Sequence, residues 1–254
     1  TAPLAQDKHK TIYTMDYDNA RPTGKQEQTG TKVTAAEFYE YTEDNRIACV
    51  KQASVSCLGV APSSFGFVIG CTTGTEYDSF GSPVKVTETD TDALTRTVTE
   101  YTYTENRKQA GSRTTVQFFA SPESMTAGTP AASDVTVTHN TYNGTGDLIR
   151  TETCTEGEEL TAGRQITEHI YDEQGNETMT RQYNSLDPSS VSCTELTCDK
   201  TGRALTETGM NGESKTELSY TPDGAVRERR LPDGDRIAYG YDRKGHRRRG
   251  HGDK

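Results

Sequence analysis

Several residue types that carry out chemistry in other proteins are present, but their spacing forms no familiar catalytic motif. No pair of histidines has the spacing, across a glutamate, of the helical zinc-binding motif, and the five are scattered at His9, His139, His169, His246 and His251. The sequence also has no Gly-x-Ser-x-Gly elbow and no phosphate-binding loop. We therefore predict that the chain is not an enzyme and binds no metal or cofactor.

Carboxylates are abundant, and the formal net charge is −10. The acidic stretches Glu88–Asp92 and Glu156–Glu159 have the spacing of solvated strand or loop residues. Asp90 and Asp92 could together bind a cation weakly, because hard cations prefer oxygen ligands. A plain acidic surface is the simpler interpretation.

The six cysteines do not require a disulfide framework, because the chain is neither short nor rich in cysteine. A single bridge between Cys49 and Cys57, or between either of them and Cys71, is plausible if the protein is exported. Cys193 and Cys198 have no second close pair of cysteines, so they are a poor zinc signature. Cys154 completes the set.

The strongest regularity is a short pattern of tyrosine, aspartate and glycine. It reads Tyr-Asp-x-x-Gly at 77–81, 171–175 and 241–245, with looser copies at 142–146, 198–202 and 220–224. Cys198 takes the tyrosine position of its copy, where we expect a small buried substitute. More worn copies begin at Tyr17, Tyr41 and Tyr103, and the spacing between copies tightens towards the C-terminus. A repeated unit of this kind usually has a packing role rather than a chemical one.

Each copy predicts a strand that ends in a tight turn. Tyrosine favours a pleated, half-buried surface, aspartate hydrogen-bonds nearby backbone N–H groups, and glycine accepts a positive φ. We predict that the structural motif residues are Tyr77, Asp78, Gly81, Tyr142, Gly146, Tyr171, Asp172, Gly175, Asp199, Gly202, Tyr220, Asp223, Gly224, Asp233, Gly234, Tyr239, Tyr241, Asp242 and Gly245.

Alternating apolar and polar residues between the turns predict β-strands, as in Val84–Thr87, Arg96–Tyr103 and Val135–Thr138. The Asp-Gly pairs at 223–224 and 233–234 are strong hairpin signals. The predicted fold is all-β, with repetitive antiparallel β-hairpins that form an extended, curling sheet.

Composition limits the core that such a sheet can have. Hydrophobic residues make up 30% of the chain and tryptophan is absent, which approaches the composition of disordered proteins. However, 41 threonines and 13 tyrosines favour strands rather than disorder. We expect a ribbon-like sheet that is held largely by backbone ladders.

Three regions follow from the regularity of the repeats. Residues 1–133 hold degenerate copies with insertions at 49–71 and 120–133, residues 134–245 form a regular array, and residues 246–254 are a basic, flexible tail. Within the first insertion, Val60–Gly70 is too short and too rich in glycine and proline to span a membrane, and it predicts an inserted loop or core plug. The second insertion predicts a surface loop.

No window predicts a helix convincingly. The best candidates, Lys32–Tyr41 and Pro122–Ala127, lack a sustained apolar stripe, so we interpret both as local turns.

Positive charge gathers near the C-terminus, where Val226–Lys254 has a net charge of +5. Its cluster of Arg243, Lys244 and Arg247–Arg249 could contact nucleic acid or an acidic partner. Aromatic residues do not interleave with these arginines after Tyr241. We therefore expect them to face the acidic sheet or an adjoining segment, and we expect no nucleic-acid partner.

The Tyr-Asp-x-x-Gly motif, with the Asp233-Gly234 turn just before the stretch Arg236–Gly245, resembles the YD repeats of Rhs proteins. Related repeats occur in wall-associated polymorphic toxins, in the cocoon components of insecticidal toxin complexes and in teneurins. The resemblance is strong over 134–245. It implies a sheet of consecutive hairpins that spirals into a hollow shell, often around a C-terminal toxic domain. The family's aspartyl self-cleavage is not implied, because the only Asp-Pro, Asp187-Pro188, lacks the associated glycine.

Two function classes remain. The first is a non-catalytic shell segment of a bacterial, secreted or surface-displayed protein, whose partners would be neighbouring repeats of the parent chain and an encapsulated effector domain. The second is a cell-surface adhesion or carbohydrate-binding module that contacts surface glycans through its tyrosines. A well-formed final repeat and the absence of an N-terminal apolar run lead us to expect a piece of a larger protein.

Overall fold

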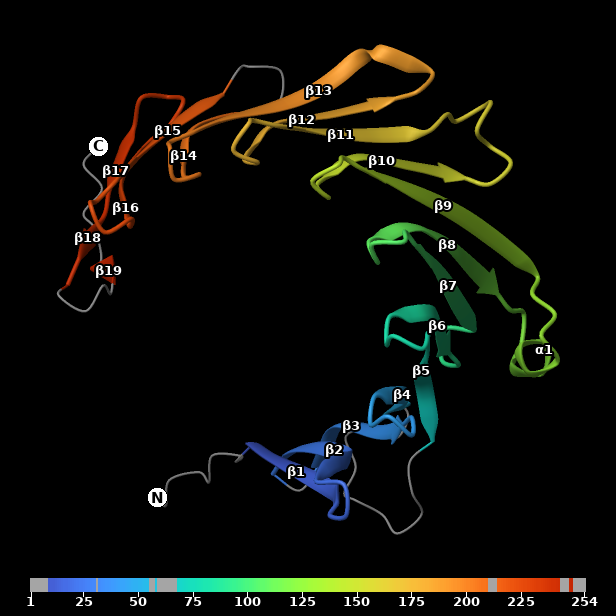
Figure 1. Ribbon diagram of the computed structural model, residues 1–254. Coiled ribbons are helices and arrows are strands. Elements are labelled where there is room, and N and C mark those ends of the chain that lie inside the picture. Colours follow the sequence, from blue (N-terminus) through green and yellow to red (C-terminus); the bar gives the residue numbers. More distant parts are fainter. Residues whose placement is uncertain are drawn as a thin grey trace. The chain divides into compact units, whose positions relative to one another are not determined.

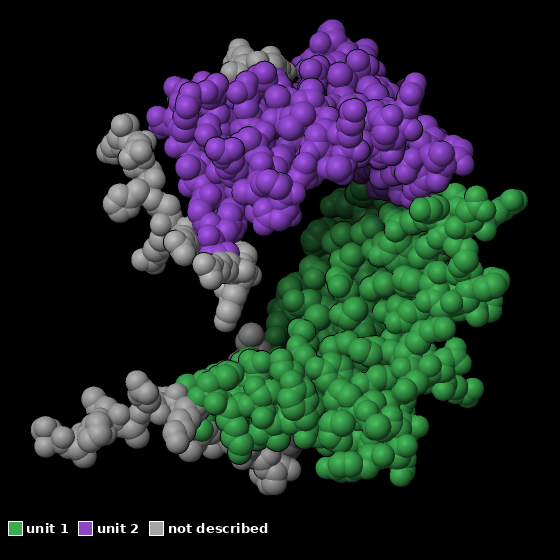
Figure 2. Space-filling view, turned by 60° about the vertical axis from the view of Figure 1, so that its left-hand side comes forward, with its two compact units in different colours: residues 1–137 green, residues 138–254 purple. Residues whose placement is uncertain are grey.

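The computed structural model describes residues 9–30, 32–54, 58, 68–209 and 214–242, and the backbone of 247–248. These residues form β-strands with one short helix (Figure 1). Contacts within the chain divide it into two compact units, residues 1–137 and residues 138–254 (Figure 2). Each unit is described by itself.

In the first unit the strands follow one another in chain order, and each pairs antiparallel with the next (Figure 1). They are β1 (His9–Asp16), β2 (Arg21–Thr29), β3 (Lys32–Tyr41), β4 (Ile47–Ala53), β5 (Ile69–Tyr77), β6 (Pro83–Asp90), β7 (Thr95–Tyr103) and β8 (Gln109–Phe118). The helix α1 (Pro122–Ala127) follows β8.

The second unit repeats this arrangement after β9 (Ala132–Tyr142), which runs across the boundary between the units. Its further strands are β10 (Leu148–Thr155), β11 (Gln165–Tyr171), β12 (Glu177–Asn184), β13 (Asp187–Cys198), β14 (Ala204–Thr208), β15 (Lys215–Tyr220), β16 (Val226–Arg230) and β17 (Arg236–Ala238). These successive strands again pair antiparallel. A separate two-stranded pair joins β18 (Gly240–Tyr241) to β19 (Arg247–Arg248). The prediction of an all-β fold of repetitive antiparallel hairpins is confirmed.

Threonine contributes to the ladders directly as well as through strand propensity. Cross-strand pairs of hydroxyls hydrogen-bond to each other, and such pairs stabilise antiparallel sheets. The distances are 3.2 Å for Thr99 and Thr114, 3.2 Å for Thr138 and Thr153, and 2.6 Å for Thr197 and Thr206.

The core is thin, as the low apolar content predicts. The buried hydrophobic residues of the described chain are Val33, Ala36, Phe119, Met125, Cys154 and Ile166. Most other strand residues are only half-buried. Backbone ladders therefore supply much of the order in each unit.

The interpretation of Pro122–Ala127 as a local turn is wrong, because this segment forms α1. Ser121 caps the helix: its side chain accepts a hydrogen bond from the Ser124 N–H at 3.3 Å, and the Ser121 N–H donates to the Ser124 hydroxyl oxygen at 3.1 Å. The helix ends at Gly128, whose φ is 71°. Caps at both ends stabilise a helix that is too short to show an apolar stripe.

The insertion around α1 is also more than a surface loop. Met125 is only 5% exposed, and Phe119 beside the helix is 7% exposed. Arg96 on β7 stacks over the Phe119 ring at 5.2 Å, and its guanidinium donates to the Met125 carbonyl at 3.2 Å. The segment therefore builds a small local core against the sheet.

Lys32–Tyr41 is not a turn either, because it forms β3. Val33 and Ala36 in this strand are buried. The strand is specified by pairing on both sides, with β2 and with β4, which local helix-like composition does not reveal.

The first insertion lies mostly outside the described residues, as do Gly245 and 249–254. Its described flanks are β4 and β5, where Cys49 faces Gly74 and Cys71 faces Gln52 across the ladder. Cys49 and Cys71 are free thiols, and Cys57 is outside the described part. In the described ranges, no helix has the length and apolar character needed to cross a bilayer.

Candidate functional site

Seven five-residue turns of one kind recur along the sheet, and we call them the motif turns. Each links an odd-numbered strand to the next even-numbered strand. Because successive strands are antiparallel, the motif turns of each unit lie at the same edge of its sheet. They span 42–46, 78–82, 104–108, 143–147, 172–176, 199–203 and 221–225.

The backbone geometry is the same in every motif turn. The first N–H donates to the fifth carbonyl at 2.8–3.0 Å, and the fourth N–H donates to the first carbonyl at 2.9–3.0 Å. The fourth residue has a left-handed φ between 61° and 91°. This is a three-residue hairpin loop with a left-handed closing residue.

The first side chain of the turn caps its backbone. Asp172 Oδ1 accepts hydrogen bonds from the Gln174 and Asn176 N–H groups at 3.0 and 2.8 Å. Threonine in the same position caps one group only, as Thr221 Oγ1 does for the Ala225 N–H at 3.0 Å. An aspartate therefore satisfies more of the turn than a threonine can.

These caps perturb the aspartates. The side chain of Asn176, followed by the backbone N–H groups, holds the pKa of the Asp172 carboxyl below its usual range. The Ser82 N–H lowers the pKa of Asp78, and the Thr201 hydroxyl with Arg203 lowers the pKa of Asp199. Each carboxylate thereby caps its own turn in the ionised form.

The motif tyrosines join neighbouring motif turns. Tyr171 at the end of β11 donates its hydroxyl to the Leu148 carbonyl at 2.9 Å, and Leu148 is the first residue after the preceding motif turn. We call such a bond a tyrosine tie. Four further ties have the same placement: Tyr77 to Ile47 (2.9 Å), Tyr103 to Pro83 (2.7 Å), Tyr220 to Ala204 (2.7 Å) and Tyr241 to Val226 (2.8 Å).

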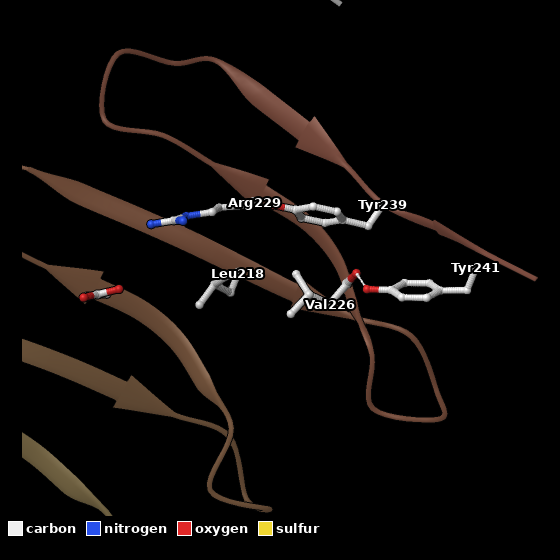
Figure 3. Close-up of a pocket in the computed structure, with 6 residues that line it drawn as sticks. Leu218, Val226, Arg229, Tyr239 and Tyr241 are labelled. Atoms are coloured by element: carbon white, nitrogen blue, oxygen red, sulfur yellow. Dashed lines mark hydrogen bonds between the residues drawn. The ribbon is translucent and has the colours of Figure 1, made fainter. Parts of the chain in front are cut away.

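Figure 3 shows the tie of Tyr241, whose hydroxyl points at the Val226 carbonyl. A pocket of about 360 Å³ lies beside the tie. Leu218, Arg229 and Tyr239 are among the residues that line it (Figure 3). Tyr41 makes a related bond to Pro22 at 2.6 Å, at the start of the array.

One motif position in the described part of the second unit carries no tyrosine. Cys198 occupies the tyrosine position at the end of β13, and its short thiol carries no phenol to reach back to Glu177, the first residue after the preceding motif turn. Cys198 is half-buried rather than buried, which corrects the expectation from the sequence.

The predicted motif residues take defined places. The last residue of a strand is a motif tyrosine at Tyr77, Tyr142, Tyr171, Tyr220 and Tyr241. The first residue of a motif turn is a predicted aspartate at Asp78, Asp172 and Asp199. The left-handed fourth residue is a predicted glycine at Gly81, Gly146, Gly175, Gly202 and Gly224. Asp223 stands in the third position of its turn, where Thr221 does the capping. Asp242 follows β18.

The Asp233-Gly234 turn, residues 231–235, has the same backbone hydrogen bonds as the motif turns but a different place in the sheet. It connects β16 to β17, an even-numbered strand to an odd-numbered one, so it lies at the opposite edge of the sheet. Gly234 still has a left-handed φ of 92°, but Leu231 in the first position has no oxygen for capping. Tyr239 lies between β17 and β18, where its N–H donates to the Arg227 carbonyl at 2.9 Å.

The worn copies of the motif gave mixed results. The copies that begin at Tyr41 and Tyr103 form motif turns although Asn45 and Arg107 replace the glycine, with φ values of 67° and 61°. The signal in both is a threonine in the first position. Tyr17 makes no such turn: it is 88% exposed in a four-residue connection.

Arginines cover several of the motif rings. Arg46 stacks over Tyr77 at 5.6 Å and Arg203 stacks over Tyr220 at 4.9 Å. Arg21 stacks over Tyr41 at 4.3 Å. Cation–π stacking of this kind occupies the ring face that a sugar would need.

The carboxylates of Asp90 and Asp92 are engaged with the chain itself. Asp90 Oδ1 accepts hydrogen bonds from the Asp92 and Ala93 N–H groups at 2.9 and 2.8 Å. The Asp92 carboxylate accepts the Ser54 hydroxyl at 2.8 Å. The described residues contain no cluster of three or more histidine, cysteine or carboxylate side chains with metal-site geometry.

Comparison with solved structures shows that the fold is shared. The crystal structure of TcdB2-TccC3 matches with a TM-score of 0.58 at 18% identity, and TcdB2-TccC3-TEV and TcdB2-TccC3-Cdc42 each match with a TM-score of 0.57 at 17% identity. Each match covers 93% of this chain and 11% of the other, so the chain spans about a ninth of those proteins. No protein-family model and no curated protein matches the sequence.

Proposed function

We propose that this chain is a non-catalytic structural segment of an Rhs/YD-type shell, secreted or displayed at a cell surface. In the parent protein it would form part of a wall that encloses or presents another domain. The observation that carries the proposal is the ladder of tyrosine ties. The motif tyrosines and aspartates that recur in the sequence are committed to joining and capping hairpins, which is an architectural role.

The shared fold supports this proposal. The crystal structure of TcdB2-TccC3 matches 93% of this chain at 18% identity, and the sequence motif independently resembles YD repeats. The partners would be neighbouring repeats at either side of the segment and an effector domain of the same parent chain.

A carbohydrate-binding platform is less well supported. Protein surfaces that bind sugars present open aromatic faces, whereas arginines cover the rings of Tyr41, Tyr77 and Tyr220. The hydroxyls of the same rings are already donated to backbone carbonyls.

The test uses the full-length parent protein and a protease that cuts exposed chain. If the wall encloses a domain, that domain resists digestion in the unmodified protein and should be cut faster when two of the ties are removed by the double substitution Tyr77→Phe and Tyr171→Phe. The matched control is Tyr17→Phe, which removes an exposed hydroxyl. If every other domain of the unmodified protein were digested rapidly, the hypothesis that the wall encloses a domain would be wrong. The wall could then only present a domain on its outside.

A further inference from the structure

The spaces between successive motif turns are filled by a recurring side chain. The fifth residue of one turn reaches towards the glycine in the fourth position of the next. A Cβ atom added to Gly81 would collide with the guanidinium of Arg46, and one added to Gly202 would collide with the amide of Asn176. Arg203 lies in contact distance of a Cβ at Gly224, 3.6 Å from its Nη1.

Arginine is the usual occupant of these spaces. Arg46 and Arg203 stack over the tyrosine of the following repeat, at 5.6 and 4.9 Å. Between turns 78–82 and 104–108 the occupant comes from the second turn: Arg107 donates to Asp78 at 3.1 Å and stacks over Phe80 at 4.1 Å. Between successive motif turns, a guanidinium therefore recurs in contact with an aromatic ring and with oxygen atoms of a turn.

One space in the second unit lacks such an occupant. The fifth residue of turn 143–147 is Asp147, an acid in place of arginine, and a Cβ at Gly175 of the next turn would meet no atom within 4 Å. The result is a groove of about 640 Å³ between the two turns. We call it the Tyr171 groove.

The lining of the Tyr171 groove suits a cation on an aromatic surface. The Tyr171 ring and Ile149 supply apolar surface, and Asp147 and Glu173 supply negative charge. His169 also lines the groove, and its Nδ1 lies 3.3 Å from the Glu177 carboxylate.

We propose that the Tyr171 groove binds an arginine side chain of a partner polypeptide, which takes the place that an internal arginine takes between other motif turns. A planar guanidinium can stack on the ring and donate to several oxygens at once, whereas a lysine ammonium offers only a point charge. A free arginine on a partner segment is therefore the occupant with the matching shape and charge.

The test measures amide chemical shifts by NMR in the intact chain, titrated with the peptide acetyl-Gly-Arg-Gly-amide at millimolar concentrations. Saturable shifts at Gln174 and Gly175 are expected with this peptide, weaker shifts with lysine in its place, and none with glutamine. Equal shifts with the glutamine peptide, shifts spread evenly over all motif turns, or no saturable shift would each overturn the proposal.

Two variants locate the site. Glu173→Lys places a positive charge at the groove and should weaken binding by about tenfold or more, a factor worth about 1.4 kcal/mol. Its matched control is Glu105→Lys, the same residue type in the same position of turn 104–108, which should leave binding unchanged. Asp147→Arg should fill the groove from within and abolish binding. Unchanged affinity in both groove variants would refute the assignment.

Discussion

The tyrosine ties give a direct prediction for the variant Tyr171→Phe. The substitution removes only the hydroxyl that donates to the Leu148 carbonyl at 2.9 Å and keeps the packing of the ring. A hydrogen bond of this kind contributes about 0.5–1.5 kcal/mol net. Because Tyr171 is half-buried, water can partly replace the lost donor, so we expect a loss of about 1 kcal/mol.

The loss should be local, because neighbouring repeats are the main contacts of each hairpin. A loss of about 1 kcal/mol lowers hydrogen-exchange protection roughly fivefold in the strands that open together. We expect this reduction in β10 to β12, with much smaller changes in β2 to β4. Native-state hydrogen exchange, read out by mass spectrometry of peptides from each strand, measures both regions in one experiment.

The control is Tyr17→Phe, which removes a hydroxyl from a ring that is 88% exposed. This variant should exchange like the unmodified protein. If Tyr171→Phe and Tyr17→Phe behaved alike, the ties would contribute nothing measurable, and the structural role of the motif tyrosines would have to rest on ring packing alone.

Three further predictions concern the motif turns. Gly175→Ala should cost about 1–2 kcal/mol in urea unfolding because its φ is 82°, whereas Gly144→Ala, without a left-handed φ, should cost much less. Cys198→Tyr should supply a hydroxyl that donates to the Glu177 carbonyl and should raise the hydrogen-exchange protection of β13; unchanged or lower protection would contradict this prediction. Because capping lowers the pKa of Asp172 in the fold, its stabilising contribution is present above its unfolded pKa of about 3.9 and is lost as the pH falls through the lower folded value. The free energy of unfolding should therefore decrease as the pH falls below about 4. Asp172→Thr keeps a capping oxygen that does not titrate, so this variant should lose less stability over the same pH range.

The strand and turn pattern was readable from the sequence because it is local. Alternation in Arg96–Tyr103 and the left-handed glycines such as Gly81 each act within a few residues. The same reasoning failed for Pro122–Ala127, because two end caps outweigh a missing apolar stripe. It failed for Lys32–Tyr41 because pairing on both sides determined the strand.

The ties and the groove could not be predicted from the sequence. The pairing of the Tyr171 hydroxyl with the Leu148 carbonyl depends on the register between hairpins, and no residue pattern reports the identity of a carbonyl acceptor. The Tyr171 groove likewise appears only when neighbouring turns are placed side by side in the structure. In an isolated turn, Asp147 and an arginine are equally acceptable in the fifth position.

In each unit the tyrosine ties lie at the edge of the sheet that carries the motif turns. Among the described residues, the connections at the opposite edge have no ties, and their lengths vary. Every motif turn has five residues, but the connections from even-numbered to odd-numbered strands range from 2 residues (30–31) to 15 residues (54–68). The segment that carries α1 is one of these long connections. Insertions can therefore accumulate in these connections without a change in the repeat register. Sequence and length can diversify there, while the five-residue motif turns keep the spacing of the hairpins constant.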